Sequence, residues 1–129
     1  MIVVDTSVWL AFFRSSDRRV VGHLQSLLEA DEVGLAVPVR TEILSGASRR
    51  DRPRLHRLLS ALPVLYPSDP TWRRIDAWIV TAIAAGESFG FGDLLIASLA
   101  ADEQAGIWSL DGDFDRMARL RLIETHAIG

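Results

Sequence analysis

Short apolar runs alternate with longer segments of helical periodicity along this chain, and this alternation constrains its fold more than any other feature. The first run, Ile2–Val4, stops at Asp5 and is apolar at consecutive positions. Consecutive apolar residues are typical of a strand that is buried on both faces. Further runs of this kind cover residues 34–37, 63–66 and 107–110, and residues 122–125 are a fifth candidate strand.

Helices are predicted between these strands. In the first half of the chain they are expected after Thr6 and Ser7, over 19–30, and from Pro38 through Leu44. A short helix that follows a loop is expected to end at Leu62, and longer helices are expected from Asp69 to Gly86 and from Asp93 to Gly106. Strands that alternate with helices predict an α/β fold, here a three-layer α/β/α sandwich with a short central parallel sheet. Because no linker or internal repeat interrupts the pattern, residues 1–129 are expected to form one domain.

Two missing residue types exclude several kinds of chemistry. The chain has no cysteine and no lysine, so all 14 cationic side chains are arginines. Disulfides, thiolate nucleophiles, P-loop lysines and Schiff-base lysines are therefore excluded. The longest stretch without a charged residue, 58–68, is too short for a membrane-spanning helix, so we expect a soluble cytoplasmic protein with no membrane partner.

Four acidic residues are expected at one edge of the predicted sheet. Asp5 and Asp111 end strands, Asp93 opens a helix, and Glu42 lies about one turn into another helix. Open parallel sheets bind ligands beyond the carboxyl ends of their strands. Carboxylates gathered there repel one another unless a cation neutralises them, and oxygen ligands suit Mg²⁺ or Mn²⁺. Taken singly, these residues have ordinary alternatives: a helix cap for Asp5 and Asp93, a solvated helix face for Glu42, and a turn for Asp111 and Asp113.

Four motifs surround these acids, and they span the length of the chain. They are Ile2-Val3-Val4-Asp5-Thr6-Ser7-Val8-Trp9, Arg40-Thr41-Glu42-Ile43-Leu44, Gly92-Asp93-Leu94-Leu95-Ile96-Ala97 and Trp108-Ser109-Leu110-Asp111-Gly112-Asp113-Phe114. In this order and spacing they resemble the motifs of PIN-domain proteins of the VapC toxin type. Two positions depart from that pattern: Phe89-Gly90-Phe91-Gly92 and Leu110 stand where the family often has polar or basic residues.

The resemblance implies a metal-dependent endoribonuclease that hydrolyses RNA with a metal-activated water and leaves a 3′-hydroxyl and a 5′-phosphate. It implies Mg²⁺ or Mn²⁺ as the cofactor and the toxin of a type II toxin–antitoxin pair as the biological role. The matching catalytic residues are Asp5, Glu42, Asp93 and Asp111, and the matching metal ligands are Asp5, Asp93, Asp111 and Asp113. Thr6 and Ser109 match positions that hydrogen-bond the ligands or a bound water.

The resemblance also implies two protein partners, a second copy of the chain and a small VapB-like antitoxin whose C-terminal segment lies across the acidic site. Apolar stripes in the predicted helices over 19–30 and 42–62 are candidates for the antitoxin groove. For the RNA substrate, the predicted contacts are Arg49, Arg50, Arg52 and Arg54, in a segment that also holds Arg57. The alternative for this segment is a solvated loop and helix face.

Two other functions stay open. The first is a catalytically silent PIN-like binding module. The second is a metal-dependent phosphatase or signalling domain, which is disfavoured because position 7 is serine where a phosphatase has a second Asp, and because no lysine is present. A formal net charge of −3 does not exclude an RNA substrate: without Asp5, Glu42, Asp93 and Asp111, 13 acids face 14 arginines.

Overall fold

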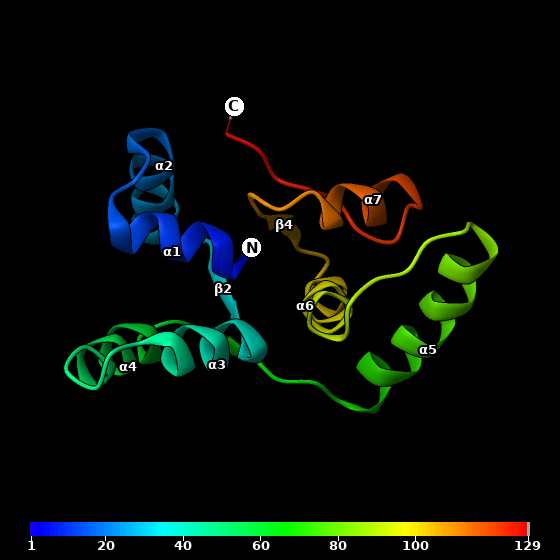
Figure 1. Ribbon diagram of the computed structural model, residues 1–129, viewed down its shortest axis with the longest axis horizontal. Coiled ribbons are helices and arrows are strands. Elements are labelled where there is room, and N and C mark those ends of the chain that lie inside the picture. Colours follow the sequence, from blue (N-terminus) through cyan, green and yellow to red (C-terminus); the bar gives the residue numbers. More distant parts are fainter. Residues whose placement is uncertain (129) are drawn as a thin grey trace.

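The computed structural model describes residues 1–128, in which a four-stranded sheet lies between layers of helices (Figure 1). The strands are β1 (Ile2–Val4), β2 (Val33–Ala36), β3 (Val64–Leu65) and β4 (Gly106–Trp108). They are ordered β3-β2-β1-β4, and every neighbouring pair is parallel. The predicted α/β fold with a short central parallel sheet is therefore confirmed.

The central position of β1 determines where the functional residues gather. Val3 and Val4 are fully buried, and β1 pairs with β2 on one side and with β4 on the other. Val4 lies opposite Trp108 in the register, so β1 and β4 end side by side. Whatever follows Val4 and Trp108 in the sequence therefore emerges at the same point of the sheet edge.

Seven helices are present among the described residues, and most lie where the sequence predicts them. They are α1 (Thr6–Arg14), α2 (Arg18–Glu29), α3 (Val37–Gly46), α4 (Arg52–Ser60), α5 (Asp69–Ala84), α6 (Phe91–Asp102) and α7 (Asp113–Arg119). None of these helices is long and apolar enough to cross a membrane. Helix α4 begins within the segment expected to start as a loop, with Pro53 in its first turn. Helix α6 begins two residues before Asp93 rather than at it.

The structure near the C-terminus adds one helix that was not predicted and corrects one predicted strand. Helix α7 is not predicted by the sequence, because its buried residues are only Phe114 and Met117, too few for a recognisable period. The candidate strand at 122–125 does not form, and only Thr125 makes a bridge to β4, opposite Ile107. The reason is that the Leu122 amide still bonds the Met117 carbonyl of α7, so only the end of the segment reaches the sheet.

Helix α6 is the most enclosed helix and carries one wall of the site. All residues from Leu94 to Ala100 are buried, so the helix has no solvent-facing stripe over that stretch. Its C-terminal end is fixed to α5, because the Asp102 carboxylate accepts hydrogen bonds from Thr71 at 2.6 Å and from Arg74 at 2.5 Å. The N-terminal end of this enclosed helix holds Asp93.

Candidate metal centre

Asp5 is the most buried acidic residue of the site, with 7% of its surface exposed. It follows β1 and caps α1, and its amide donates a hydrogen bond to the Trp108 carbonyl at 2.9 Å. Its Oδ2 atom accepts hydrogen bonds from the Ser7 hydroxyl and the Ser109 hydroxyl, both at 2.8 Å, and from the Ser7 amide at 3.4 Å. Because these contacts all use Oδ2, the Oδ1 atom receives none from the described residues and is available to a cation.

Ser7 joins the ends of β1 and β4, a role that the sequence did not reveal. Its hydroxyl accepts a hydrogen bond from the Leu110 amide at 3.0 Å while it donates to Asp5. Ser109 connects the same two strand ends, since its hydroxyl donates to Asp5 and accepts a hydrogen bond from the Asp111 amide at 2.9 Å. The position of Ser7, two residues after a helix-capping Asp, was the available signal, because capping carboxylates contact that position.

Thr6 and Glu42 form the side of the site that belongs to α1 and α3. Partial burial raises the pKa of Glu42, the Thr6 hydroxyl lowers it, and the negative charge of Asp5 raises it. The Thr6 Oγ1 atom is buried and lies close enough to Glu42 to lower that pKa, but it makes no well-aligned hydrogen bond with the described residues. A buried hydroxyl without a partner is costly, so this position favours a bound water or ion beside it.

Asp93, Asp111 and Asp113, which we call the acidic trio, come from two segments: the first turn of α6 and the turn that leads from β4 into α7. One carboxylate oxygen from each residue lies within 4.8 Å of the others. Asp111 also accepts a hydrogen bond from the Asp113 amide at 3.1 Å, which orients the turn that leads into α7. Burial, a hydrogen bond with Asp113 and the negative charges of Asp113, Asp5 and Asp111 raise the pKa of Asp93 to about 7.

The structure therefore places all five predicted acids at one edge of the sheet, with the trio closest together. The carboxylate of Asp5 is not within the trio, but its charge raises the pKa values of both Asp93 and Glu42. The donor set is all oxygen and negatively charged, and the Thr6 hydroxyl next to it lacks a partner. These residues fit a hard divalent cation such as Mg²⁺ or Mn²⁺.

Arg116 is the cation that the structure brings to the trio, and the sequence had not singled it out. It forms salt bridges with Asp113, at 2.8 Å, and with Glu87. The hydrogen bond from Arg116 is the largest cause of a lowered pKa at Asp113, followed by the hydrogen bond with Asp93. Arg116 is therefore part of the site, because its guanidinium pairs with Asp113, a candidate metal ligand.

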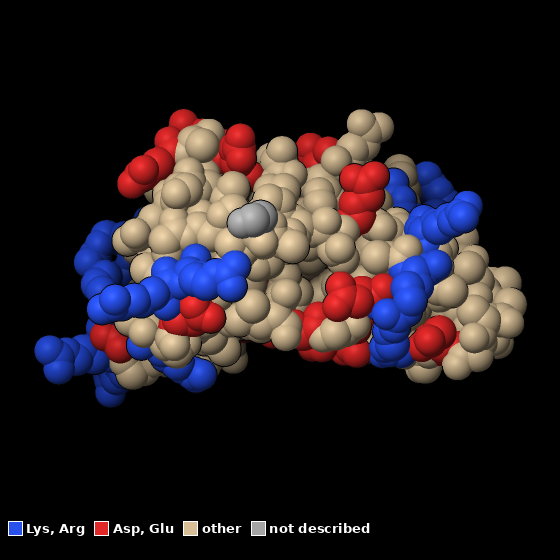
Figure 2. Space-filling view, turned by 90° about the horizontal axis from the view of Figure 1, so that it is seen from above, with Lys and Arg blue, Asp and Glu red and all other residues tan. Residues whose placement is uncertain are grey.

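The arginines predicted to contact RNA lie elsewhere. Arg49, Arg50 and Arg54 are exposed, and α4 is packed on α3, on the side away from α6 and α7 (Figure 1). The view from above also shows arginine side chains gathered toward the two ends of the molecule (Figure 2). Arg52 is engaged within the chain, because its Nε and Nη2 atoms donate to the carbonyls of Leu44 and Ala47 at 3.1 and 3.0 Å. It completes the C-terminal end of α3.

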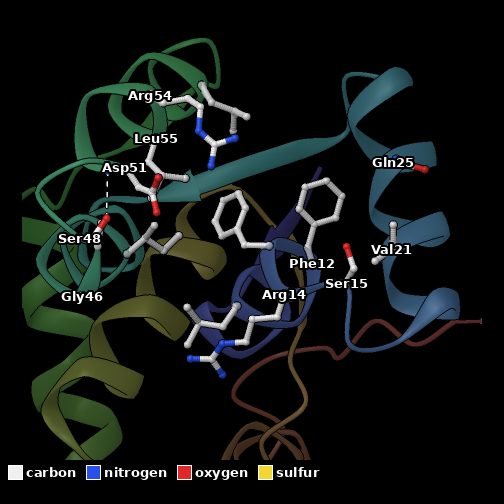
Figure 3. Close-up of a pocket in the computed structure, with 15 residues that line it drawn as sticks. Phe12, Arg14, Ser15, Val21, Gln25, Gly46, Ser48, Asp51, Arg54 and Leu55 are labelled. Carbon is white, nitrogen blue, oxygen red and sulfur yellow. Dashed lines mark hydrogen bonds between the residues drawn. The ribbon is translucent and has the colours of Figure 1, made fainter.

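A groove of about 530 Å³ lies between α1, α2, α3 and α4 (Figure 3). Its floor is largely apolar and includes Phe12, Ile43 and Leu55, and Leu58 lies exposed in its wall. Arg14 and Arg54 line it from opposite sides, on α1 and α4 (Figure 3). An apolar floor with arginines at the margins suits an amphipathic segment that carries acidic side chains.

Comparison with known proteins places this geometry in a family context. The family model described as the PIN domain matches residues 2–120. Ribonuclease VapC11 of Mycobacterium tuberculosis is 38% identical over 125 residues, which cover 93% of each chain. The structure also resembles VapBC2 from Rickettsia felis bound to a DNA fragment from its promoter, with a TM-score of 0.79, 19% identity and 98% of each chain covered. A member of the VapBC family of toxin–antitoxin systems, VapBC-5 from Mycobacterium tuberculosis, has a TM-score of 0.69, 22% identity, and covers 95% of this chain and 94% of its own.

The raised pKa of Asp93 predicts how pH affects the stability of the metal-free protein. In the unfolded chain this carboxyl titrates near 3.8, whereas in the folded chain it titrates near 7, so the folded state binds more protons between these values. The stability linked to this proton is present at low pH and is lost as the pH rises toward 7. Asp93→Asn should therefore stabilise the metal-free protein at pH 8 and have a smaller effect at pH 5.

Urea unfolding in the presence of a chelator, at several pH values from 5 to 8, measures this difference. Asp76→Asn is the matched control, because Asp76 is exposed on α5. Parallel pH profiles for wild type and Asp93→Asn would contradict the prediction.

Proposed function

This chain belongs to the PIN domain family, and we propose that it is a metal-dependent endoribonuclease that acts as the toxin of a toxin–antitoxin pair. The observation that carries the proposal is the acidic trio, whose oxygens lie within 4.8 Å of one another next to the buried Asp5. Support also comes from the 38% identity to Ribonuclease VapC11 over 93% of both chains. We treat residues 1–129 as one nuclease domain, and the proposed role requires a cytoplasmic location.

Each acid has a role that follows from its surroundings. Asp5 Oδ1 and the carboxylates of the acidic trio would hold Mg²⁺ or Mn²⁺. When bound, this ion supplies charge neutralisation at the phosphodiester and lowers the pKa of the attacking water. Ser7 and Ser109 orient the Asp5 carboxylate by donating hydrogen bonds from their hydroxyl groups to its Oδ2 atom.

Glu42 is proposed to accept a proton from the attacking water, and Thr6 is proposed to orient that water. The pKa of Glu42 is raised, which makes this carboxylate a better proton acceptor, and the Thr6 hydroxyl beside it is free to orient a water molecule. No cysteine or lysine is available as a protein nucleophile, which agrees with direct attack by water. Arg49, Arg50 and Arg54 are proposed to contact the RNA backbone away from the cleaved bond.

RNA cleavage by the purified protein tests the proposal. Wild type is expected to cut RNA with Mg²⁺ or Mn²⁺, to stop when a chelator is added, and to leave 5′-phosphate ends. Asp5→Asn and Asp93→Asn should each lower the rate at least about 100-fold, because each removes a negatively charged ligand of the cation that would neutralise the phosphodiester. Asp76→Asn is again the control and should cleave like wild type.

The same assay separates the nuclease from a binding module that resembles it. If wild type binds RNA but cuts none with any divalent cation, the chain is a catalytically silent member of the family. If both Asn variants cleave as fast as wild type, the acidic edge is not the active centre.

The groove between α1 and α4 is the proposed docking site of the antitoxin. The apolar residues at its floor and the arginines at its margins fit an amphipathic segment with acidic side chains. Leu58 is 43% exposed there, so Leu58→Glu should place a charge in the interface without disturbing the core.

Co-expression with the small protein expected beside its gene tests this docking site. Wild type should co-purify with that protein, and Leu58→Glu should lose it. Val80→Glu, on an exposed part of α5, is the control and should keep it. Retention of the partner by Leu58→Glu would contradict the site.

A second copy of the chain is the proposed partner of the outer face of α5. Large apolar side chains are exposed along this face and at the start of α6, namely Trp72, Ile79, Val80, Ile83 and Phe91. Val80, Ile83 and Phe91 are each at least 68% exposed, and Trp72 stacks on Phe91 with 6.0 Å between ring centroids. A contiguous patch of this kind is typical of an interface between subunits.

The mass of the protein in solution tests the dimer. Light scattering should give twice the chain mass of 14.3 kDa for wild type and the single-chain mass for Ile83→Glu. Leu58→Glu is the control, because it changes the groove and not α5. A dimeric Ile83→Glu variant, or a monomeric wild type, would contradict this interface.

A further inference from the structure

Arg116 connects two segments that border the acidic trio. From α7, its Nη1 atom donates to the Glu87 carboxylate, which lies in the loop between α5 and α6, and its Nη2 atom donates to Asp113 at 2.8 Å. The guanidinium carbon lies 4.9 Å from the centre of the Phe89 ring, in the same loop as Glu87. Two carboxylates and one aromatic face therefore fix both the position and the plane of this guanidinium.

Asp113 needs such a partner because of what it faces. One of its carboxylate oxygens lies within 4.8 Å of an oxygen of Asp93 and of an oxygen of Asp111. Its side chain is 40% exposed, so without a partner it could turn into solvent and escape the repulsion of the other two. The fork of Arg116 holds it against that repulsion, since one arm binds Asp113 while the other is anchored on Glu87.

We propose that Arg116 is a positioning residue that keeps Asp113 close enough to Asp93 and Asp111 for all three to share one divalent cation. This inference rests on the proposed metal-dependent function. A lysine cannot replace the fork, because a single ammonium group does not span two carboxylates with fixed geometry. The segment 87–89 acts as the outer anchor of the arrangement, which ties the start of α6 to the start of α7.

A positioning role and a purely electrostatic role of Arg116 predict opposite changes in the affinity for a divalent cation when Arg116 is replaced. Arg116 is a positive charge beside a cation site, so its removal would tighten metal binding if charge were all that mattered. If Arg116 positions Asp113, its removal lets a ligand leave and weakens binding. The sign of the change in affinity therefore distinguishes the two.

Direct binding of Mn²⁺, measured by calorimetry on the purified full-length protein, is the test. Arg116→Gln should raise the dissociation constant about 10-fold or more, as expected when a partner of a metal ligand is lost. Arg116→Lys keeps the charge and should still bind Mn²⁺ more weakly than wild type. Arg119→Gln, an exposed arginine on the same helix, should bind like wild type.

Binding of Mn²⁺ by Arg116→Gln as tightly as by wild type, or more tightly, would overturn the proposal, and so would wild-type affinity in Arg116→Lys. If Arg116→Gln fails to fold, Arg116→Lys decides alone. RNA cleavage by the same samples tests the nuclease activity separately from the positioning role of Arg116. If wild type binds Mn²⁺ and cuts no RNA while the Arg116 variants bind more weakly, the nuclease proposal fails and the positioning role stands.

Discussion

Repulsion between carboxylates is the constraint on which the rest of this structure depends. Asp93, Asp111 and Asp113 present oxygens within 4.8 Å of one another, and Asp5 is buried close enough to raise the pKa of Asp93. Charges held in this way oppose folding in the absence of a cation. The architecture must therefore supply rigid supports for each carboxylate, and most of the contacts around the site can be understood as such supports.

These supports are built at the ends of regular elements rather than in long loops. Asp5 follows the central strand, Asp93 lies in the first turn of the buried helix α6, and Asp113 opens α7. Helix α6 cannot slide to relieve the repulsion, because Asp102 at its far end is bound by Thr71 and Arg74. At the sheet edge, the Ser7 and Ser109 hydroxyls hold Asp5 and link it to the turn that carries Asp111. Rigid elements hold a ligand set in place more accurately than loops do.

The sequence predicts the parts of this arrangement that depend on topology. Strands that are parallel and adjacent end at one edge, so Asp5 and Asp111 could be placed together from the order of apolar runs alone. Contacts that a side chain makes with a distant segment leave no periodic signal, and the hydrogen bonds of Ser7 with the Leu110 amide and of Arg116 with Glu87 are contacts of that kind. Helix α7 was missed for a related reason, because only Phe114 and Met117 mark its buried face. Arg52 has a role that its charge-rich segment does not indicate, because its side chain bonds the carbonyls of Leu44 and Ala47, and its predicted contact with RNA stays a prediction.

The absence of lysine affects the fold as well as the chemistry, because every cationic side chain is an arginine that can bridge two acceptors. Three arginines each bridge two acceptors within the chain: Arg52 joins two carbonyls, Arg74 joins Asp102 to Ser98, and Arg116 joins Glu87 to Asp113. A planar fork with several donors can make such bridges, whereas an ammonium group binds as a point charge. These three side chains serve the fold, so the arginines of this chain fall into two groups. Arg52, Arg74 and Arg116 stabilise the framework, and the exposed arginines at the ends of the molecule remain available to a polyanion.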